Sequence, residues 1–463
     1  MNAKLALEQL EMAPVSKWHW KTFWILGFAL QFNGFLNSSG SAVMADLVAA
    51  GWSNNYLNAF FSSAMMIGFF VGSLVAGTLG DNIGRKKTYE LCILTFATFS
   101  LLAAISPNIY FLIVCRGLMG IGMGGGIVLG YGSFTEFMPA RVRGTWSARI
   151  SLLGNLSPLI ALAVSAALIP STSWRSVFVV GSMASFVILI VVHRKLDESP
   201  RWLIESGREA EGIEIVSKVV NQSGPLDEQW LEDNRASEEK DIQSALEKSA
   251  TKVPIWGFFK GDLGRRTLVA TATLVAMNLS LYTITVWVPT IFVNKGIDIK
   301  SSLLMSTVMM IGAPVGVWLA TLIMDKFPRK KLGSTLIVAV AVLGYTYSIQ
   351  STQASILIIG TIMILVLYIY NAFSSAVYAP EIWPTEYKMR GLGIANSIGR
   401  VTAILSPYMV AWLLTDFGVT SVFIVLGVLL GLCALILAFF GIETRGRSCE
   451  ELAVPVSNQP ANP

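Results

Sequence analysis

The sequence predicts an all-α membrane protein with twelve transmembrane helices in two pseudo-symmetric six-helix bundles. Two observations lead to this prediction: the composition is strongly apolar, and a short charged signature occurs once in each half of the chain. Of the 463 residues, 54% are hydrophobic and only 14% are charged, and the mean hydropathy is +0.61. One soluble core of ordinary proportions cannot bury so much apolar surface, so the chain belongs in a membrane.

Twelve apolar stretches are long enough to cross a bilayer, which takes roughly 20 helical residues. They lie at 22–45, 56–79, 88–106, 109–133, 145–169, 176–192, 267–292, 302–324, 333–350, 354–379, 392–414 and 418–441. Each must be helical, because hydrocarbon offers no partner for unpaired backbone amides and the alternating pattern of transmembrane strands is absent. The first stretch lacks a clear cleavage site and is too long for a signal peptide, so we expect a retained helix.

The division into domains follows from these stretches. We expect an N-terminal six-helix bundle at 1–192, a cytoplasmic inter-bundle loop at 193–265, a C-terminal six-helix bundle at 266–445 and a disordered cytoplasmic tail at 446–463. Within the loop, Ser206 and Glu209 fit a capping box, and apolar residues follow at helical spacing. This pattern predicts a short amphipathic helix, followed by a polar linker at 221–250.

The distribution of cations predicts the orientation. Clusters that contain Lys86, Arg143, Lys330 and Arg445 all fall on one side of the twelve-span order, and the opposite loops hold few cations. By the positive-inside bias, both termini are cytoplasmic. We expect a multi-pass protein of the plasma membrane, of the bacterial inner-membrane type. The net charge of +5 therefore needs no nucleic-acid partner to explain it.

No motif indicates catalysis, a metal or a cofactor. The four cysteines have no CxxC or Cys/His spacing that could hold zinc, and three of them lie within predicted spans. The sequence contains no phosphate loop and no nucleophile motif, and His19 and His193 lie at the edges of spans. We therefore expect no enzyme activity, no catalytic residue, no metal and no cofactor.

The charged signature shows that the two halves are related. The run GTLGDNIGRKK at 77–87 corresponds to TLIMDKFPRKK at 321–331, an offset of 244 residues. At nearly the same offset, Glu136 and Glu198 in the first half correspond to Glu381 and Glu443 in the second. Leu-Ser-Pro also occurs twice, at 156–158 and 405–407, which predicts matching proline kinks. Repeats of this size in an apolar chain favour a two-halved transporter.

The pattern Gly77-x3-Asp81-x2-Gly84-Arg85-Lys86 resembles the cytoplasmic signature of the major facilitator superfamily. The runs ESPRWL at 198–203, PEIWPT at 380–385 and ETRG at 443–446 are similar to motifs of its sugar-porter, organic-ion and metabolite-symporter branches. The resemblance covers almost the whole chain. It implies a transporter in which two six-helix bundles rock about a central site. We expect it to act as a monomer in the lipid bilayer.

The charged residues of the signature are candidates for a gate. Asp81 and Arg85 stand four residues apart where a span meets the cytoplasm, so they can face one another on a helical turn. The resemblance implies that Arg85 pairs with Glu136, and Arg329 with Glu381, as latches that hold the cytoplasmic side shut. Alternatively, these charges only set the topology. The gating candidates are Asp81, Arg85, Glu136, Arg143, Glu198, Arg201, Asp325, Arg329, Glu381, Arg390 and Glu443.

Two arginines lie deep inside predicted spans, where a central charge costs about 2.5 to 3.5 kcal/mol. Arg400 lies roughly 14 Å into its span, which favours a cavity-facing role in binding an anion or in the gate. Arg116 lies nearer the outer end and precedes the glycine-rich run GLMGIGMGGG at 117–126. Close helix packing explains the glycines. The resemblance links such an arginine to proton coupling, and the sequence leaves its role open.

The first span has amides where related symporters carry acids. Many metabolite symporters of this kind read FDGYD there, whereas this chain reads FNGFLN at 32–37. Because Asn takes up no proton near neutral pH, the chain either couples through another group or ion, or is a facilitator. The substrate-binding candidates in the spans are Asn33, Asn37, Arg116, Asn155, Asn278, Tyr282, Trp287, Asn371, Tyr378, Asn396 and Arg400.

These features together predict a secondary active transporter for a small organic solute. The arginines in the spans, without a deep carboxylate in the first or fourth span, favour an organic acid as substrate, and co-transport of a proton stays open. An efflux carrier for drugs or excreted metabolites fits the same motifs. A membrane sensor or scaffold that transports nothing is the alternative from another class.

Overall fold

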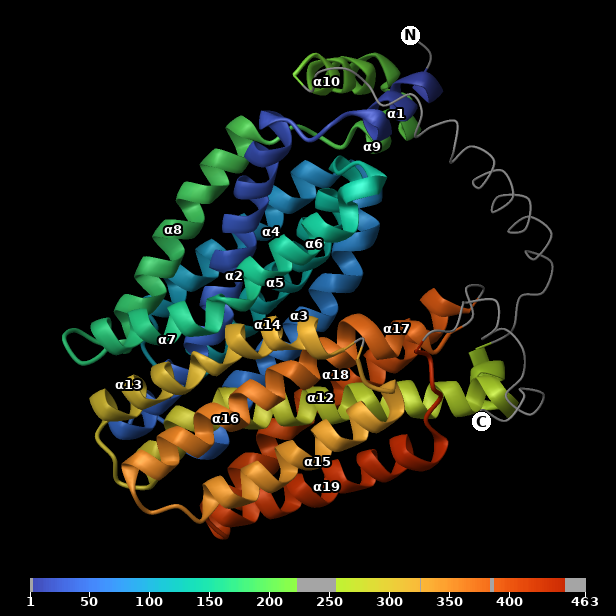
Figure 1. Cartoon of the computed structure of the whole chain (residues 1–463). Coiled ribbons are helices and arrows are strands. Elements are labelled where there is room, and N and C mark those ends of the chain that lie inside the picture. The colour runs from blue at the N-terminus through green and yellow to red at the C-terminus, as the bar shows by residue number, and fades with distance from the viewer. Residues whose placement is uncertain (1–2, 223–254, 325, 384–386, 446–463) are drawn as a thin grey trace. The chain divides into compact units, whose positions relative to one another are not determined.

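The computed structural model describes residues 3–222, 255–324, 326–383 and 387–445, and all regular elements of this part of the chain are helical (Figure 1). The first half forms α1 (Ala3–Met12), α2 (Lys17–Ala49), α3 (Asn55–Ile83), α4 (Arg85–Ala104), α5 (Ile109–Phe137), α6 (Ala140–Asn155), α7 (Ser157–Leu168), α8 (Trp174–Lys195), α9 (Pro200–Glu205) and α10 (Glu209–Asn221). The second half forms η1 (Ile255–Phe259), α12 (Gly261–Asn294), α13 (Ile299–Met310), α14 (Gly312–Ile323), α15 (Arg329–Ser348), α16 (Gln353–Ala372), η2 (Phe373–Tyr378), α17 (Ala379–Glu381), α18 (Lys388–Asp416) and α19 (Val419–Phe440).

The predicted spans coincide with these helices. Among the described residues, 11 helical segments are long and apolar enough to cross a membrane. Three of them join consecutive elements: α6 with α7, α13 with α14, and α16 with η2 and α17. The remaining predicted span, 22–45, lies in α2, which is long but less apolar because Gln31, Asn33 and Asn37 interrupt its hydrophobic sequence.

The contacts divide the chain into two compact units. One comprises Met1–Gly40 and Ala64–Ser244, and the other comprises Ser41–Ser63 and Ala245–Pro463. The division near residue 244 lies within the range predicted for the inter-bundle loop. The sequence did not predict that Ser41–Ser63, the end of α2 and the start of α3, would cluster with the second half of the chain.

Capping side chains explain where several helices begin. Asn108, Ser173, Asp298 and Thr352 precede α5, α8, α13 and α16, and the side-chain oxygen of each accepts a backbone N–H from the first turn. Such caps satisfy amides that have no partner inside the helix. These four residues end the loops on the side opposite the charged signature, and each stabilises the first turn of the span that follows.

Glycines let neighbouring helices approach closely at corresponding places in both halves. A methyl group on Gly72 of α3 would overlap the carbonyl oxygen of Ile121 in α5. A methyl group on Gly316 of α14 would overlap the carbonyl oxygen of Leu365 in α16. Both pairs are separated by the 244-residue offset, so the internal repeat extends from the charged signature to the helix packing.

The Leu-Ser-Pro repeat gives different results in the two halves. In the first half, α6 ends at Asn155 and α7 begins at Ser157, so the span is interrupted. In the second half, α18 continues through Pro407 as one helix. The repeat thus interrupts only the first of the two helices, because the proline lies at the start of α7 but inside α18, and the matching kinks stay a prediction.

A small helical module lies at the signature end of the first unit, by which we mean the end that carries residues 77–87. There α10 packs on α9 and on α1. The predicted amphipathic helix is present as α10, but the predicted capping box is wrong, because Arg208 precedes the helix and Ser206 ends α9. Hydrogen bonds from Arg208 lower the pKa of the exposed Glu211 carboxyl in the first turn of α10. Most of the predicted linker and the whole predicted tail lie outside the described residues.

Candidate functional site

The charged signature of the first half forms a cluster at the start of α4, which we call the first latch: Asp81, Arg85, Glu136 and Glu198. The Arg85 guanidinium lies 2.5 Å from the Asp81 carboxylate and 3.3 Å from the Glu136 carboxylate. Glu198 accepts a hydrogen bond of 2.9 Å from the backbone N–H of Lys86. The predicted contact of Arg85 with Glu136 is therefore present, and a second carboxylate binds the start of α4, where the helix dipole is positive.

Gly84 makes this arrangement possible. It precedes α4 with φ at 106°, a backbone conformation that side-chain-bearing residues rarely adopt. A methyl group here would lie 2.5 Å from the Glu198 carboxylate. The Trp202 indole also binds here, because it donates a hydrogen bond of 2.8 Å to the Asp81 carbonyl oxygen.

The signature of the second half forms the second latch: Arg329, Glu381, Glu443 and Thr444. The Arg329 Nε atom lies 3.1 Å from the Glu381 carboxylate, so the predicted pair is present. The guanidinium also donates to the carbonyl oxygen of Met324. Glu443 accepts backbone N–H groups of Arg329 and Lys330 at 2.8 and 3.2 Å, in the position that Glu198 holds in the first half.

Thr444 was not among the candidates, yet its hydroxyl donates a hydrogen bond of 2.6 Å to the Glu381 carboxylate. The Arg329 side chain is also more buried than Arg85, with 8% of its surface exposed against 21%. The Glu381 side chain is nevertheless more exposed than Glu136, at 34% against 23%, so only the arginine of the second latch is better shielded from water. The charges of the second latch are held by more hydrogen bonds. Only the alignment of ETRG with ESPR could have drawn attention to Thr444.

The other gating candidates lie outside these two clusters. Arg143 donates a hydrogen bond of 3.2 Å to the Met138 carbonyl oxygen. The exposed Arg390 places its guanidinium 5.4 Å from the ring centre of Phe258. Arg201 is half-buried in α9. Asp325 lies outside the described residues.

Arg116 is buried in a structural contact between α5 and α2. Its two terminal nitrogens donate hydrogen bonds of 2.8 Å each to the carbonyl oxygens of Leu36 and Asn37. Asn33 is also buried, and its amide donates a hydrogen bond of 2.9 Å to the Met123 carbonyl oxygen. These contacts favour a role in holding α2 against α5, because they occupy the Asn33 amide nitrogen and both terminal nitrogens of Arg116.

Arg400 has a different environment. It lies inside α18, is half-exposed, and forms no hydrogen bond or ion pair with any residue in the described part of the chain. Tyr282 of α12 lies within electrostatic range of its guanidinium. On the same face of α18, one turn earlier, the half-exposed Asn396 bonds only to the Leu392 carbonyl oxygen of its own helix.

Asn278 lies close to this group. Its amide nitrogen would be 3.0 Å from a methyl group on Gly399, and it donates to the Leu274 carbonyl oxygen of its own helix. The structure thus brings four of the predicted residues together on the facing sides of α12 and α18. They are Asn278, Tyr282, Asn396 and Arg400.

The remaining substrate-binding candidates are dispersed. Trp287 is fully buried in α12. Tyr378 is also buried, and its hydroxyl exchanges hydrogen bonds with the backbone of Ile442 at 2.9 and 3.0 Å. Asn155 bonds to the Ser151 carbonyl oxygen within α6, and Asn371 is half-buried at the end of α16. The burial of Trp287 and the hydrogen bonds of Tyr378 favour packing over solute binding.

Sequence reasoning also missed polar contacts within the second unit. Arg266 is fully buried at the start of α12, where it lies 2.6 Å from the Asp262 carboxylate and donates to the Ile382 carbonyl oxygen. Asn55 at the start of α3 donates a hydrogen bond of 3.1 Å to the Thr415 hydroxyl of α18. No sequence signal identified the contacts of Arg266 with Ile382 and of Asn55 with Thr415, because their members are far apart in the chain.

Comparison with known proteins identifies the class. Residues 22–454 match the family described as sugar (and other) transporters, and the chain belongs to this family. It is a secondary transporter of the major facilitator type, not an enzyme.

The sequence is similar to several bacterial transporters. It is 48% identical to the inner membrane metabolite transport protein YdjE of Escherichia coli, over 96% of this chain and 97% of the relative. It is 24% identical to the niacin transporter NiaP of Acinetobacter baylyi, over 97% and 99% of the two chains. It is 25% identical to the 4-hydroxybenzoate transporter PcaK of the same species, over 87% and 86%.

The fold matches a solved transporter structure. The inward open conformation of the xylose transporter XylE from E. coli superposes with a TM-score of 0.70 and covers 94% of this chain and 99% of that one. The two sequences are only 16% identical, so the match concerns the fold alone. It agrees with the twelve-helix, two-bundle architecture.

Proposed function

We propose that the protein transports a small organic acid across the bacterial inner membrane by alternating access. One observation carries the choice of substrate: Arg400 lies inside a membrane-spanning helix, is half-exposed, and has no carboxylate partner among the described residues. A cation at such depth is costly without an anion beside it. A substrate carboxylate would supply that anion and would form two hydrogen bonds with the planar guanidinium.

The neighbours of Arg400 suit the rest of such a substrate. The Tyr282 ring offers an aromatic surface and a hydroxyl, and the amides of Asn278 and Asn396 can bind carbonyl or hydroxyl groups. Niacin and 4-hydroxybenzoate, named as substrates of two relatives, are both small aromatic acids. Aromatic monocarboxylates are therefore the first class to test. Arg116 is left out of the proposed site because its guanidinium is bound to the carbonyl oxygens of α2.

The two latches are proposed to regulate access from one side of the membrane. The cations gather at their end of each bundle, so we place this end, with both termini, in the cytoplasm. Each latch joins the starts and ends of several helices, and a change in its ion pairs would alter how those ends pack. The release and re-formation of the pairs is the proposed link between substrate binding and opening.

Uptake assays with Arg400→Gln test the substrate assignment. Proteoliposomes that contain the full chain are given radiolabelled benzoate-type acids, neutral sugars and quaternary amines, with and without a proton gradient. We expect uptake of acids, and we expect Arg400→Gln to reduce it at least tenfold below saturation. The physical reason is the loss of a charge-assisted contact of about 1.5 to 3 kcal/mol.

The control variant Lys300→Gln removes an exposed cation at the start of α13 and should transport at the wild-type rate. Arg400→Lys keeps the charge but not the planar arrangement of donors, so its uptake of acids should lie between that of the wild type and that of Arg400→Gln. Wild-type uptake of neutral or cationic solutes only would contradict the assignment, as would full acid uptake by Arg400→Gln. A dependence on the proton gradient would establish coupling, and uptake without it would indicate facilitated diffusion.

A further inference from the structure

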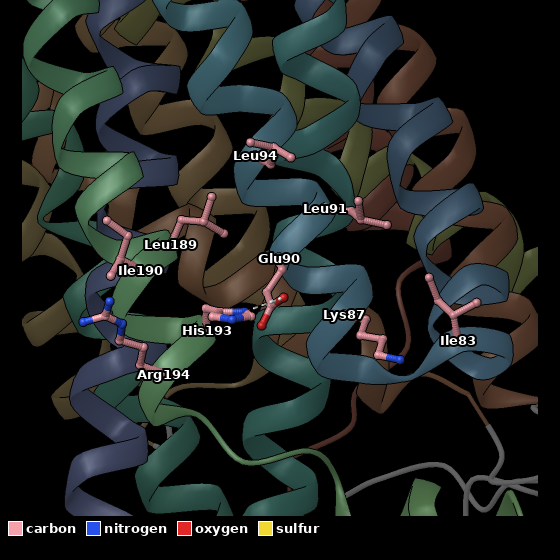
Figure 2. A pocket seen from close by; sticks show the side chains of 9 residues that line it. All are labelled: Ile83, Lys87, Glu90, Leu91, Leu94, Leu189, Ile190, His193 and Arg194. Carbon is pink, nitrogen blue, oxygen red and sulfur yellow. Dashed lines mark hydrogen bonds and ion pairs between the residues drawn. The ribbon is translucent and has the colours of Figure 1, made fainter.

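A groove on the exposed side of the first unit lies between α4 and α8, next to the first latch. The two helices pack side by side, and the groove encloses a volume of about 590 Å³. Figure 2 shows its lining, with side chains from both helices and Ile83 from the end of α3. No role in the proposed transport path accounts for this groove.

The end of the groove nearest the first latch is charged. Lys87 lies in the first turn of α4, and Arg194 lies in the last turn of α8. Between them, the His193 ring lies 3.3 Å from the Glu90 carboxylate (Figure 2). A hydrogen bond of 2.9 Å from the Lys86 ammonium to the His193 carbonyl oxygen fixes the two helices here.

Lys87 and Arg194 are available to an outside anion. In the described part of the chain, neither forms an ion pair with a carboxylate. Glu211 acts on Lys87 only through its longer-range field and is already bound by Arg208. The charged end therefore presents two cations, one from each helix, on either side of the Glu90 carboxylate that the His193 ring contacts.

The rest of the groove is apolar. Leu91 and Leu94 lie about 6 and 10 Å further along α4 than Lys87, at 1.5 Å per residue. From the antiparallel α8, Leu189 and Ile190 line the opposite wall. Leu91, Leu94 and Ile190 are each more than two-fifths exposed, as expected for side chains that face lipid. The groove thus passes from charged to apolar in the direction that leads from the membrane surface into the hydrocarbon.

We propose that this groove binds one anionic phospholipid, with its phosphate between Lys87 and Arg194 and an acyl chain along the four apolar residues. Basic side chains at the membrane surface attract anionic headgroups, and a preformed apolar wall accepts the chain. A soluble phosphate would use only the charged end and leave the apolar part unfilled. That the lipid comes from the inner leaflet rests on the orientation proposed above; the binding itself does not.

The second half supplies a matched control. Lys331 corresponds to Lys87 at the 244-residue offset, but α19 carries Ala438 and Phe439 where α8 carries His193 and Arg194, at the offset that relates Glu443 to Glu198. The corresponding place therefore has a cation on one helix only. The proposal predicts preferential binding of an anionic lipid to the first half.

Native mass spectrometry of the purified full chain tests this. The protein is stripped of lipid in detergent and titrated with dioleoyl phosphatidylglycerol or dioleoyl phosphatidylethanolamine. We expect at least threefold more phosphatidylglycerol than phosphatidylethanolamine bound at equal concentration. Lys87→Gln with Arg194→Gln should abolish this preference, whereas Lys331→Gln should keep it.

Two further variants guard against a general disturbance of the fold. Lys87→Arg with Arg194→Lys keeps both charges and should bind phosphatidylglycerol like the wild type. Leu94→Trp fills the apolar part without changing charge and should reduce binding of phosphatidylglycerol at least threefold. Equal binding of the two lipids by the wild type would overturn the proposal, and so would undiminished binding by the Lys87→Gln, Arg194→Gln variant.

Discussion

The first and second latches use the same types of residue at corresponding helix starts, but the arginine of the second is more deeply buried. In both, an arginine binds a glutamate from a neighbouring helix, and a later glutamate accepts amides at the start of the helix. In the first latch, Arg85 has a second carboxylate in Asp81, and all partners are partly exposed. In the second, Arg329 is largely buried, and Thr444 binds the Glu381 carboxylate as well.

The comparison shows that the duplicated sequence preserves the ion pair and not the backbone that leads to it. Gly84 precedes α4 with φ at 106°, whereas Pro328 precedes α15 with φ at −57°. A proline cannot adopt the first of these conformations. The carboxylates of Glu198 and Glu443 nevertheless reach the same amides, because each comes from a segment that follows the sixth span of its half.

The largest effect should come from a feature that the halves share. Gly72→Ala and Gly316→Ala each place a methyl group against a backbone carbonyl oxygen of the neighbouring helix. Each should lower the free energy of unfolding by about 3 kcal/mol, since helix backbones cannot yield as flexible side chains do. Unfolding in mixed detergent micelles measures this loss.

Gly77→Ala and Gly431→Ala are controls in open surroundings, and neither should destabilise the protein. A large loss for one of the test variants only would mean that the packing of the two halves is less alike than the repeat indicates.

The second prediction concerns the difference between the latches. Glu381→Gln removes the carboxylate charge beside a guanidinium that is only 8% exposed, and should cost about 2 kcal/mol of unfolding free energy. Glu136→Gln should cost about 0.5 kcal/mol, because its partner is more exposed and retains Asp81. Both are measured by the same unfolding assay. Equal losses would show that the difference in burial has no energetic consequence.

The third prediction concerns the different backbone conformations of the residues that precede α4 and α15. Gly84→Ala forces a side chain into a left-handed conformation and against the Glu198 carboxylate, and should cost about 1.5 kcal/mol. Pro328→Ala should cost about 0.5 kcal/mol, because it mainly increases the freedom of the unfolded chain. The apparent melting temperatures of the two variants decide the matter, and a greater loss for Pro328→Ala would contradict this account.

The sequence predicted the spans and the latch contacts well, for physical reasons. Spans depend on local hydropathy, and the contacts of Arg85 with Glu136 and of Arg329 with Glu381 were implied by the resemblance of the signature motifs to those of the family. It did not predict that Ser41–Ser63 would cluster with the second half, because this depends on contacts such as that of Asn55 with Thr415.

The sequence identified substrate-binding candidates by residue type, but it did not show which groups surround each of them. Asn33, Trp287 and Tyr378 are polar or aromatic residues of spans, as are Asn278 and Tyr282. The structure buries the first three among neighbouring helices; it also buries Asn278, but it places Asn278 and Tyr282 near Arg400. Which face of a helix meets a neighbour depends on residues distant in the chain, and hydropathy alone does not contain that information.

The sequence by itself determined the membrane-spanning helices, the duplication and the charges at the ends of the helices, because these follow from local composition and repeated spacing. Only the tertiary structure separated the two arginines inside the spans. The α2 carbonyl oxygens of Leu36 and Asn37 occupy the Arg116 guanidinium, whereas no described residue pairs with Arg400. The reason is that a buried charge takes its role from groups that other helices place around it.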